Sequence, residues 1–416
     1  MGKSKMKSLL KKKEEEEELF SFADLPEHVV IKIIEMVPAR YLYNTFRFIC
    51  NSWNDMITSA QFTAQNTTVN QTKSELFIQI AVTWRKQDYK VKLLEMDHKG
   101  LDFKSEDFYT RMGKIRSSCD GLILVVNKNI NGNGIGILYV QNLLTRSSLS
   151  LPKCPSDCRH EQCGAAIGFD HSKKQYKVVH MCADQFGYEI FTLGGSDDSW
   201  KRIPGPFEES YDRPFNGETF RWGDPVLING QVMHWYVDSD EYAVSMNISD
   251  EKTYRTYFPD IGQEIDKERY KLLEMGRYLA FVYKVSSSQI DVWILKDYCH
   301  GQNCWVKRHS MIKESMNYIK SSSSSSSSKT SSKLQDHNPL PDFMRLFPVA
   351  SLRDGEVIVF MHQTSKNVSG CLYFYEIRHM ELKKFNLRMR DRSSFVPHRS
   401  SLIHWKHEKE LLPKSS

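Results

Sequence analysis

The 416-residue sequence predicts an α+β protein of two parts, a cluster of three short helices followed by a mostly β domain of propeller type. Residues 24–62 place apolar side chains at helical spacing, whereas residues 75–377 contain short runs of alternating apolar and polar side chains. Gly, Asn, Asp and Ser cluster between these runs, as they do between the strands of an all-β domain.

The strand-like runs repeat with a weak period of about fifty residues, four strands to a unit, which is typical of a propeller blade. Five units end in a Trp, Leu or Phe close to a basic residue or proline. The endings are LSLP (149–152), WKRIP (200–204), YRTYFP (254–259), WVKRHS (305–310) and LKKFNL (382–387). The strands at 75–96 add a candidate blade, and a β-sandwich is the competing architecture.

The first helix has clear start and stop signals. Asp24 and Glu27 form a predicted capping box, and Pro26 occupies the first turn. Pro38 ends the helix, because proline disfavours helical geometry in the residue before it. The apolar face is expected to contain Val29, Val30, Ile33, Ile34 and Val37.

Two further helices are expected, one with Leu42, Thr45, Phe46 and Ile49 on one side, and one with Trp53, Met56, Ile57 and Ala60. Three helices in about forty residues are too few to stabilise themselves without a metal, a disulfide or a partner. Their surplus apolar side chains therefore pack on the β domain or form a docking surface for another protein.

The composition, 40% hydrophobic and 26% charged, is that of a globular protein. The sequence has nine scattered cysteines without a C-x2-C pair, and it has no apolar run of signal-peptide or membrane-spanning length. These observations predict reduced thiols and a cytoplasmic or nuclear protein without a membrane partner. The charged N-terminus (1–20) and the Ser-rich segment (321–336) are expected to be disordered. The β domain is expected to span 71–400, followed by a tail (401–416).

No catalytic, cofactor-binding or metal-binding residue is predicted. Cys154, Cys158 and Cys163, with His160 and His171 nearby, lack the paired C-x2-C spacing of structural zinc sites, which favours a reduced surface loop. The patterns GxSxG, HExxH and GxxxxGK[ST] are absent from the sequence. The basic run 383–392 is expected to be a solvated hairpin face, because it lacks the clustered aromatic residues of a nucleic-acid surface.

The stretch LPEHVVIKIIEMVPARYLYNTFRFICNSWNDMITSAQF (25–62) resembles an F-box. Asn51 stands where that family usually has a basic residue. Downstream, SSCDGLILV (117–125), AIGFDHSKKQYKVVHM (166–181) and VLINGQVMHWYV (226–237) are similar to elements of the F-box-associated domain of plant proteins. The F-box pattern is matched at Leu25, Pro26, Val30, Ile33, Ile34, Val37, Pro38, Leu42, Phe46, Arg47, Cys50, Trp53, Ile57 and Phe62.

The resemblance implies a non-catalytic substrate-recognition subunit of an SCF-type E3 ubiquitin ligase. The F-box (21–65) would dock on a small Skp-type adaptor and through it on cullin, and the β domain would hold a target for ubiquitination and proteasomal degradation. The implied adaptor contacts are Leu25, Pro26, Val30, Ile33, Ile34, Pro38, Leu42 and Trp53. The alternative is a propeller module that binds a protein or glycan and has a helical cap; a hydrolase is weaker.

Target recognition is expected on the loops of one propeller face, since loops vary while packed blades do not. The candidate loops are 183–187, 207–224, 238–241 and 297–304. Loop 207–224 is the longest and is rich in aromatic and Arg residues, which dominate interface energetics. The expected target contacts are Tyr211, Arg213 and Arg221.

Overall fold

The computed structural model describes most of the chain in two compact units, Met1–Asn70 and Gln71–Ser416. The described residues are 25–70, 72–81, 89–97, 101–110, 113–128, 136–156, 158, 160, 163–181, 187–195, 197–205, 223–237, 239–297, 304–319, 340–362, 370–389 and 393–405. The segments 1–20 and 321–336, which we expected to be disordered, lie outside them.

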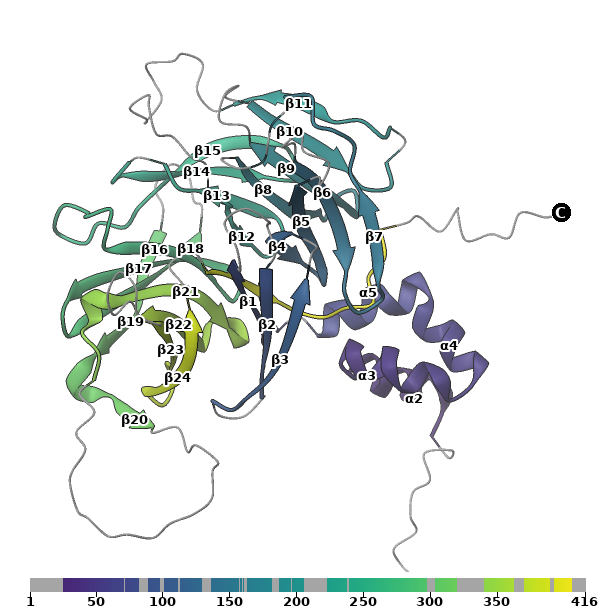
Figure 1. Ribbon diagram of the computed structural model, residues 1–416, viewed down its shortest axis with the longest axis horizontal. Helices are drawn as coiled ribbons and strands as arrows, with labels where there is room; N and C mark the ends of the chain where they lie inside the picture. The colour runs from purple at the N-terminus through teal and green to yellow at the C-terminus, as the bar shows by residue number, and fades with distance from the viewer. Residues whose placement is uncertain are drawn as a thin grey trace, which may run out of the picture. The chain divides into compact units, whose positions relative to one another are not determined.

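The first unit is helical (Figure 1). Its described part contains α2 (Glu27–Glu35), α3 (Ala39–Asn44), the 3-10 helix η2 (Phe46–Phe48), α4 (Asn51–Thr58) and α5 (Ala60–Val69). Two predictions were wrong: there is a fourth α-helix, and Pro26 occupies the N-cap of α2, which makes Glu27 its first residue. None of the described helices is long and apolar enough to cross a bilayer.

The unpredicted helix α5 closes the C-terminal end of α2. The Asn66 side-chain amide donates to the backbone carbonyls of Glu35 and Val37, at 2.8 and 2.9 Å, and Asn70 donates to Glu35 at 3.1 Å. The last carbonyls of a helix have no intrahelical partner, so these amides satisfy acceptors that burial would otherwise leave unpaired. Ser59 caps α5 by accepting from the Phe62 amide at 3.3 Å.

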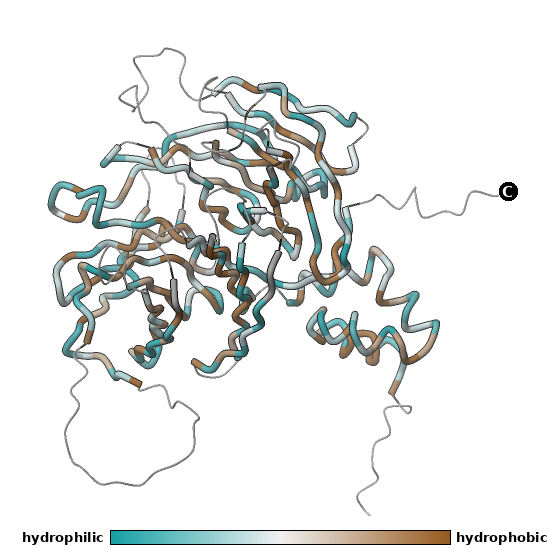
Figure 2. The backbone as a smooth tube through the Cα atoms, in the orientation of Figure 1, coloured by the Kyte–Doolittle hydropathy of each residue, from teal (hydrophilic) through white to brown (hydrophobic). Residues whose placement is uncertain are grey.

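The second unit is a six-bladed β-propeller, which confirms the predicted architecture over the β-sandwich. Within the described residues, each blade is a sheet of four antiparallel strands, and blade 6 has a fifth strand, β20, parallel to β24. The hydrophobic residues gather along the strands, whereas the turns between them are mostly hydrophilic (Figure 2). Alternation of this kind buries one set of side chains between blades and leaves the other for solvent.

The strands follow chain order from blade to blade. Blade 1 contains β25 (Ser394–His398), β1 (Glu75–Ala81), β2 (Tyr89–Met96) and β3 (Phe103–Thr110). Blade 2 contains β4 (Lys114–Cys119), β5 (Leu122–Lys128), β6 (Gly136–Asn142) and β7 (Ser147–Ser150). Blade 3 contains β8 (Gly164–Asp170), β9 (Gln175–Met181), β10 (Gly187–Thr192) and β11 (Lys201–Pro204). Blade 4 contains β12 (Val226–Ile228), β13 (Val232–Trp235), β14 (Tyr242–Asn247) and β15 (Lys252–Tyr257). Blade 5 contains β16 (Tyr270–Met275), β17 (Tyr278–Ser286), β18 (Gln289–Asp297) and β19 (Cys304–Ile312). Blade 6 contains β20 (Asn317–Ile319), β21 (Leu346–Leu352), β22 (Val357–His362), β23 (Gly370–Glu376) and β24 (Glu381–Met389).

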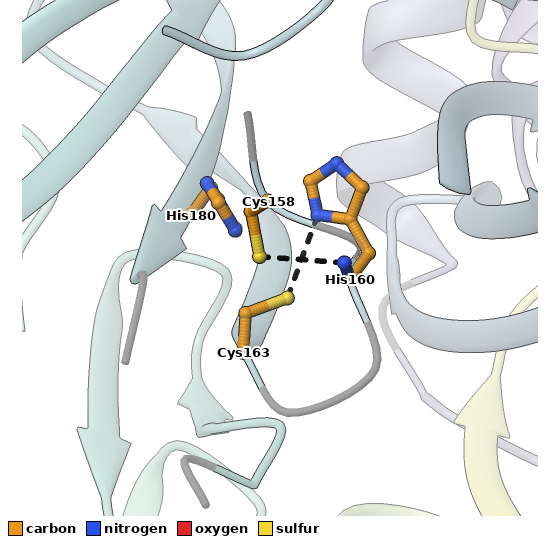
Figure 3. Close-up of side chains that lie close together, drawn as sticks. All are labelled: Cys158, His160, Cys163 and His180. Carbon is orange, nitrogen blue, oxygen red and sulfur yellow. Dashed lines mark hydrogen bonds between the residues drawn. The ribbon is translucent and has the colours of Figure 1, made fainter. Parts of the chain in front are cut away.

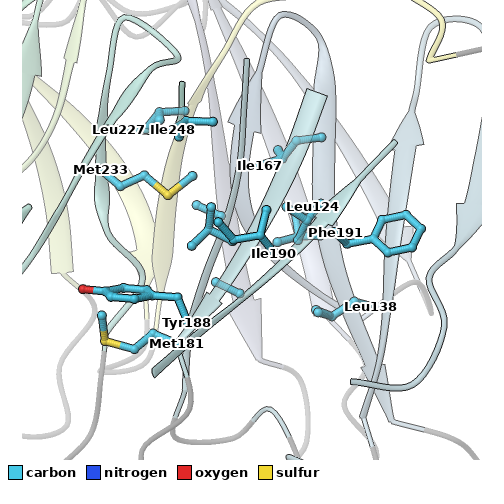
Figure 4. Packing of buried hydrophobic residues seen from close by; sticks show 14 of the residues in the cluster. Leu124, Leu138, Ile167, Met181, Tyr188, Ile190, Phe191, Leu227, Met233 and Ile248 are labelled. Carbon is cyan, nitrogen blue, oxygen red and sulfur yellow. The ribbon is translucent and has the colours of Figure 1, made fainter. Parts of the chain in front are cut away.

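Apolar clusters join neighbouring blades around the ring. The largest lies among blades 2, 3 and 4 and contains Leu124, Ile167 and Met233 (Figure 4). Four others join blades 4 and 5, 5 and 6, 6 and 1, and 1 and 2. Burial of these side chains is the main favourable term in the stability of the ring, because apolar area removed from water contributes about 25 cal/mol per Å².

The ring closes where the C-terminal strand β25 pairs with β1, with Val396 opposite Phe77. Arg399 pairs with the Asp120 carboxylate in the β4–β5 turn, where Asp120 and Gly121 both have positive φ (48° and 83°). Such a two-residue turn favours Asp-Gly, which explains the CDG sequence there. The domain extends past residue 400, where we had placed the start of a tail, because Leu402 is buried.

A buried ion-pair network joins blades 3 and 4. The Lys177 ammonium lies 2.8 Å from Asp170 Oδ2 and 2.9 Å from Glu251 Oε1, and donates to the Ile248 carbonyl at 3.0 Å. Burial alone would raise the pKa of Asp170, but hydrogen bonds from Lys177, Ser172 and the Lys173 backbone hold this pKa well below its usual range.

Asp170 is therefore expected to stabilise the propeller in a pH-dependent way. Its lowered pKa contributes stability above the pKa of an unfolded Asp, about 3.9, and this contribution is lost as the pH falls below that value. Asp170→Asn should lower the free energy of unfolding at neutral pH by roughly 2 kcal/mol, because Lys177 keeps Glu251 as a partner. It should also flatten the loss of stability as the pH falls from about 4 to about 2. Urea denaturation across this range measures both effects.

The matched control is Asp266→Asn, which removes a solvent-exposed partner of Arg269. Exposed ion pairs contribute little, so this change should stay within about 0.5 kcal/mol at every pH. If the free energy of unfolding of Asp170→Asn fell with acid as steeply as that of the wild type, the buried pair would not be the source of the pH dependence.

The closure by β25 gives a second prediction. A chain that ends at residue 392 lacks β25 and Leu402, which leaves β1 with an unpaired edge and blade 1 without its first strand. Differential scanning calorimetry should then find no cooperative transition for the β domain. A control that ends at Trp405 keeps every described residue and should retain the transition. A cooperative transition in the shorter chain would contradict this account of the closure.

Candidate functional site

The helical unit exposes an unusual share of large apolar side chains. Of the eleven that are exposed among the described residues, six belong to this unit, although it contributes only residues 25–70. They are Ile33, Met36, Tyr41, Phe48, Ile49 and Val69. Single exposed apolar residues are normal on a protein surface, but a concentration of them indicates a binding surface.

The structure divides the eight predicted adaptor contacts into three groups. Pro26, Ile33 and Pro38 are exposed, and Leu25, Val30 and Trp53 are partly buried. Ile34 and Leu42 are 1% and 0% exposed, so their assignment to a docking surface was wrong. Both pack inside the molecule because they lie on the inner side of α2 and α3.

Five of the six exposed apolar residues were not among those predicted contacts: Met36, Tyr41, Phe48, Ile49 and Val69. Ile33 and Met36 lie three residues apart at the end of α2 and so share one face of it. The Arg47 guanidinium lies over the ring of Tyr43, 3.7 Å from its centroid, and over that of Phe48, 4.5 Å from its centroid. These cation–π contacts hold the Phe48 ring in place while leaving it 68% exposed.

The third helix region is fixed by an aromatic stack. Phe46 in η2 and Trp53 in α4 have ring centroids 5.8 Å apart and planes inclined by 20°. Trp53 is therefore partly covered by its own unit, and its exposed part is what a partner could contact.

The predicted target contacts Tyr211, Arg213 and Arg221 lie outside the described residues, as does most of the loop that contains them. The described end of that loop is held firmly. Asp224 forms an ion pair with Arg116 of β4, and its second oxygen lies 3.6 Å from Lys114 Nζ. In the loop 238–241, the Ser239 hydroxyl accepts from the amides of Glu241 and Tyr242 at 3.0 and 3.3 Å.

Three described residues of the blades, Trp200, Trp235 and His234, are buried. Trp200 and Trp235 are buried in the apolar cluster of blades 2 to 4. Burial lowers the pKa of His234 to about 3, so this imidazole is neutral, and its Nδ1 lies 2.7 Å from the Ser245 hydroxyl. This arrangement is that of a hydrogen-bonded strand residue.

The cysteine-rich segment is not the surface loop that we expected. Cys154, His160 and Cys163 are buried, and Cys158 is partly buried. His171 is exposed in the β8–β9 turn and takes no part in the cluster. His180 of β9 and Glu189 of β10, which the spacing along the chain did not reveal, join these side chains in space.

Comparison with known families gives two matches. The family described as F-box associated beta propeller domain matches residues 67–409, and the F-box domain matches residues 22–65. A comparison with curated proteins gave no match.

Solved structures with low similarity to this chain include proteins of varied description. A putative 6-phosphogluconolactonase from Bacteroides uniformis has a TM-score of 0.36 and 10% identity, over 77% of this chain and 85% of that chain. The β-propeller domain of the Trilobed protease from Pyrococcus furiosus has a TM-score of 0.35 and 10% identity, over 83% and 96% of the two chains.

Proposed function

The chain belongs to the F-box-associated β-propeller family and has an F-box domain before the propeller, and from this we propose that it is a substrate-recognition subunit of an SCF-type ubiquitin ligase. F-box domains bind Skp-type adaptors in SCF complexes, and both domains are typically non-catalytic. The finer proposal is that this F-box docks on a Skp-type adaptor, and through it on cullin, while the propeller holds a target protein for ubiquitination and degradation. Such a subunit would act in the cytoplasm or the nucleus.

The observation that supports adaptor docking is the apolar surface of the helical unit. Ile33, Phe48 and Ile49 are 40%, 68% and 60% exposed, although each would gain free energy by leaving water. Fully burying one such side chain contributes about 1.5–3 kcal/mol. The buried Ile34 and Leu42 hold the helices together beneath this surface, so the unit does not need these exposed side chains for its own packing.

The proposed mechanism needs no bond chemistry from this chain. A target held by the propeller and a ligase held by the F-box become parts of one complex, so ubiquitin transfer occurs at a high effective concentration. The propeller suits this role because its blades fix the positions of the loops between strands. We propose that Tyr211, Arg213 and Arg221 contact the target from loop 207–224.

Adaptor docking is tested with the double substitution Ile33→Ser, Ile49→Ser. Truncating an interface hot spot costs about 2 kcal/mol, which is roughly thirtyfold in affinity, so the pair should weaken binding to a purified Skp-type adaptor by at least that factor. Isothermal titration calorimetry measures the dissociation constant. Because both side chains are exposed, the helical unit should keep its circular dichroism spectrum.

The matched control is Val306→Ser, Ile312→Ser, which removes two apolar side chains of similar exposure from β19 of the propeller. This control should bind the adaptor like the wild type. Equal adaptor affinity in the Ile33/Ile49 variant and the wild type would refute docking through this surface. A wild-type chain without measurable affinity for the adaptor would favour a scaffold role.

Target recognition is tested with the triple substitution Tyr211→Ala, Arg213→Ala, Arg221→Ala. The variant should bind the adaptor with unchanged affinity but lose its targets, which would then accumulate in cells. Quantitative proteomics of ubiquitinated proteins, with the wild type and the Ile33/Ile49 variant side by side, measures this. If the triple variant restored target turnover as well as the wild type, the target site would lie elsewhere on the propeller.

A further inference from the structure

Four side chains of the cysteine-rich segment and of blade 3 converge on one point. Cys158, His160, Cys163 and His180 each offer one ligand atom, and these four atoms all lie within 4.8 Å of one another (Figure 3). Cys163 Sγ is 3.5 Å from His160 Nδ1. A tetrahedral zinc ion with Zn–S bonds of about 2.3 Å and Zn–N bonds of about 2.0 Å holds its ligand atoms roughly 3.3–3.8 Å apart, so only small shifts would bring the four into contact with one ion.

The Glu189 carboxylate orients the His180 ring. Its Nδ1 lies 3.0 Å from Glu189 Oε2, so the ring donates its Nδ1 proton to this carboxylate. The Nε2 atom is buried and makes no hydrogen bond in the described part of the chain, although buried polar atoms normally have a partner. A carboxylate that holds one ring nitrogen while the other is left for a metal is the usual arrangement around zinc-bound histidine.

Glu189 is itself held in place. It accepts a hydrogen bond from the Ser156 hydroxyl at 2.9 Å and pairs with Arg202 Nε at 3.3 Å. On the β9–β10 ladder Glu189 lies directly opposite His180, so the sheet register itself brings the two together. Ligand and supporting carboxylate are therefore fixed by backbone pairing.

The backbone of the cysteine-rich segment is held from blade 2. The Arg116 guanidinium donates to the His160 carbonyl at 3.0 Å and to the Cys163 carbonyl. These two hydrogen bonds fix the backbone at two of the four converging residues.

We propose that Cys158, His160, Cys163 and His180 bind one zinc ion in a closed, structural site. Two thiolates and two imidazoles in a compact group form the ligand set that selects zinc, and four protein ligands leave no open position for a substrate. Cys158, His160 and Cys163 lie on the connection from β7 of blade 2 to β8 of blade 3, and His180 is the penultimate residue of β9. The ion would therefore fasten the connection between two blades to the second strand of blade 3.

Cys154 is a neighbour of this site and not one of its ligands. It lies within reach of His180 and Glu189 as an alternative group of three, and its Sγ is 3.7 Å from His160 Nε2, the ring nitrogen remote from Cys163. Glu189, however, is already engaged by His180, Ser156 and Arg202. The second chemical competitor is a disulfide between Cys158 and Cys163, which would consume both thiolates. The experiment separates these two alternatives from zinc.

The test uses the full chain, purified under reducing conditions, and mass-spectrometric metal analysis. The wild type should contain one zinc per chain, and strong chelation should lower its thermal midpoint. Replacement of zinc by cobalt should give the visible bands of a tetrahedral ion and a thiolate-to-cobalt charge-transfer band. Cys163→Ser should lose the metal. Glu189→Gln keeps all four ligands and should lower the zinc affinity about 10- to 100-fold. This variant tests the site independently, because loss of zinc in Cys163→Ser could also result from misfolding.

Two controls bound the site. Cys154→Ser should retain zinc, as should Cys371→Ser, which changes a buried cysteine of blade 6. Four outcomes would each overturn the proposal. They are a wild type that stays free of zinc after reconstitution, an unchanged zinc content in Cys163→Ser, a loss of zinc in Cys154→Ser, and a Cys158–Cys163 disulfide in the reduced preparation. The proposal does not depend on the ligase role, since neither adaptor nor target enters the measurement.

Discussion

The propeller depends on one pairing between segments more than three hundred residues apart, β25 with β1. Among the described strands, each of the other blades is built from strands that are consecutive in sequence, whereas blade 1 combines β25 from the C-terminal end with β1, β2 and β3. Side chains reinforce the pairing: Ser118 and His398 Nδ1 are 2.8 Å apart, and Asn142 donates to the Ser401 and Ile403 carbonyls at 2.9 Å each. Contacts of such long range form late and slowly because loop closure must precede them. The SSCDGL motif is explained by this closure, because its Asp-Gly turn is where Arg399 and Ser401 attach.

The blades could be predicted from their alternating apolar residues, whereas strands that pair across a long sequence distance could not. The strand β25 has the sequence SFVPH, which is short and contains a proline, and nothing local to it reveals that β1 needs a partner. Helix α5 was missed for a different reason: its buried residues are Phe62, Thr63, Asn66 and Thr67. These recur at helical spacing, but three of the four are polar, so a search for apolar periodicity passes over them. Ser59 as an N-cap was the signal that could have revealed the helix.

The candidate sites show a similar division. In α2 the sequence VVIKII is apolar nearly all round, so the family pattern selects both Ile33 and Ile34, and only the packed structure tells that the first is exposed and the second buried. At the cysteine cluster, Cys163 and His180 are separated by the whole β8–β9 hairpin, and its register places Ala165 opposite His180. Zinc sites are recognised in sequence when two ligands share one tight turn. Here a strand supplies one ligand and a connection the others, so spacing along the chain conceals the group.

Blade 3 is joined to both of its neighbours by polar contacts as well as by apolar packing, and this bears on recognition. Lys177 of β9 reaches Glu251 in the β14–β15 turn of blade 4. On the other side, Arg116 of blade 2 binds the backbone of His160 and Cys163 and also pairs with Asp224, the residue that ends loop 207–224. One guanidinium thus connects the proposed zinc segment to the base of the proposed target loop. A recognition loop loses less conformational entropy on binding when its ends are fixed beforehand. The Arg116–Asp224 pair would therefore fix the base of the loop that the target is proposed to contact.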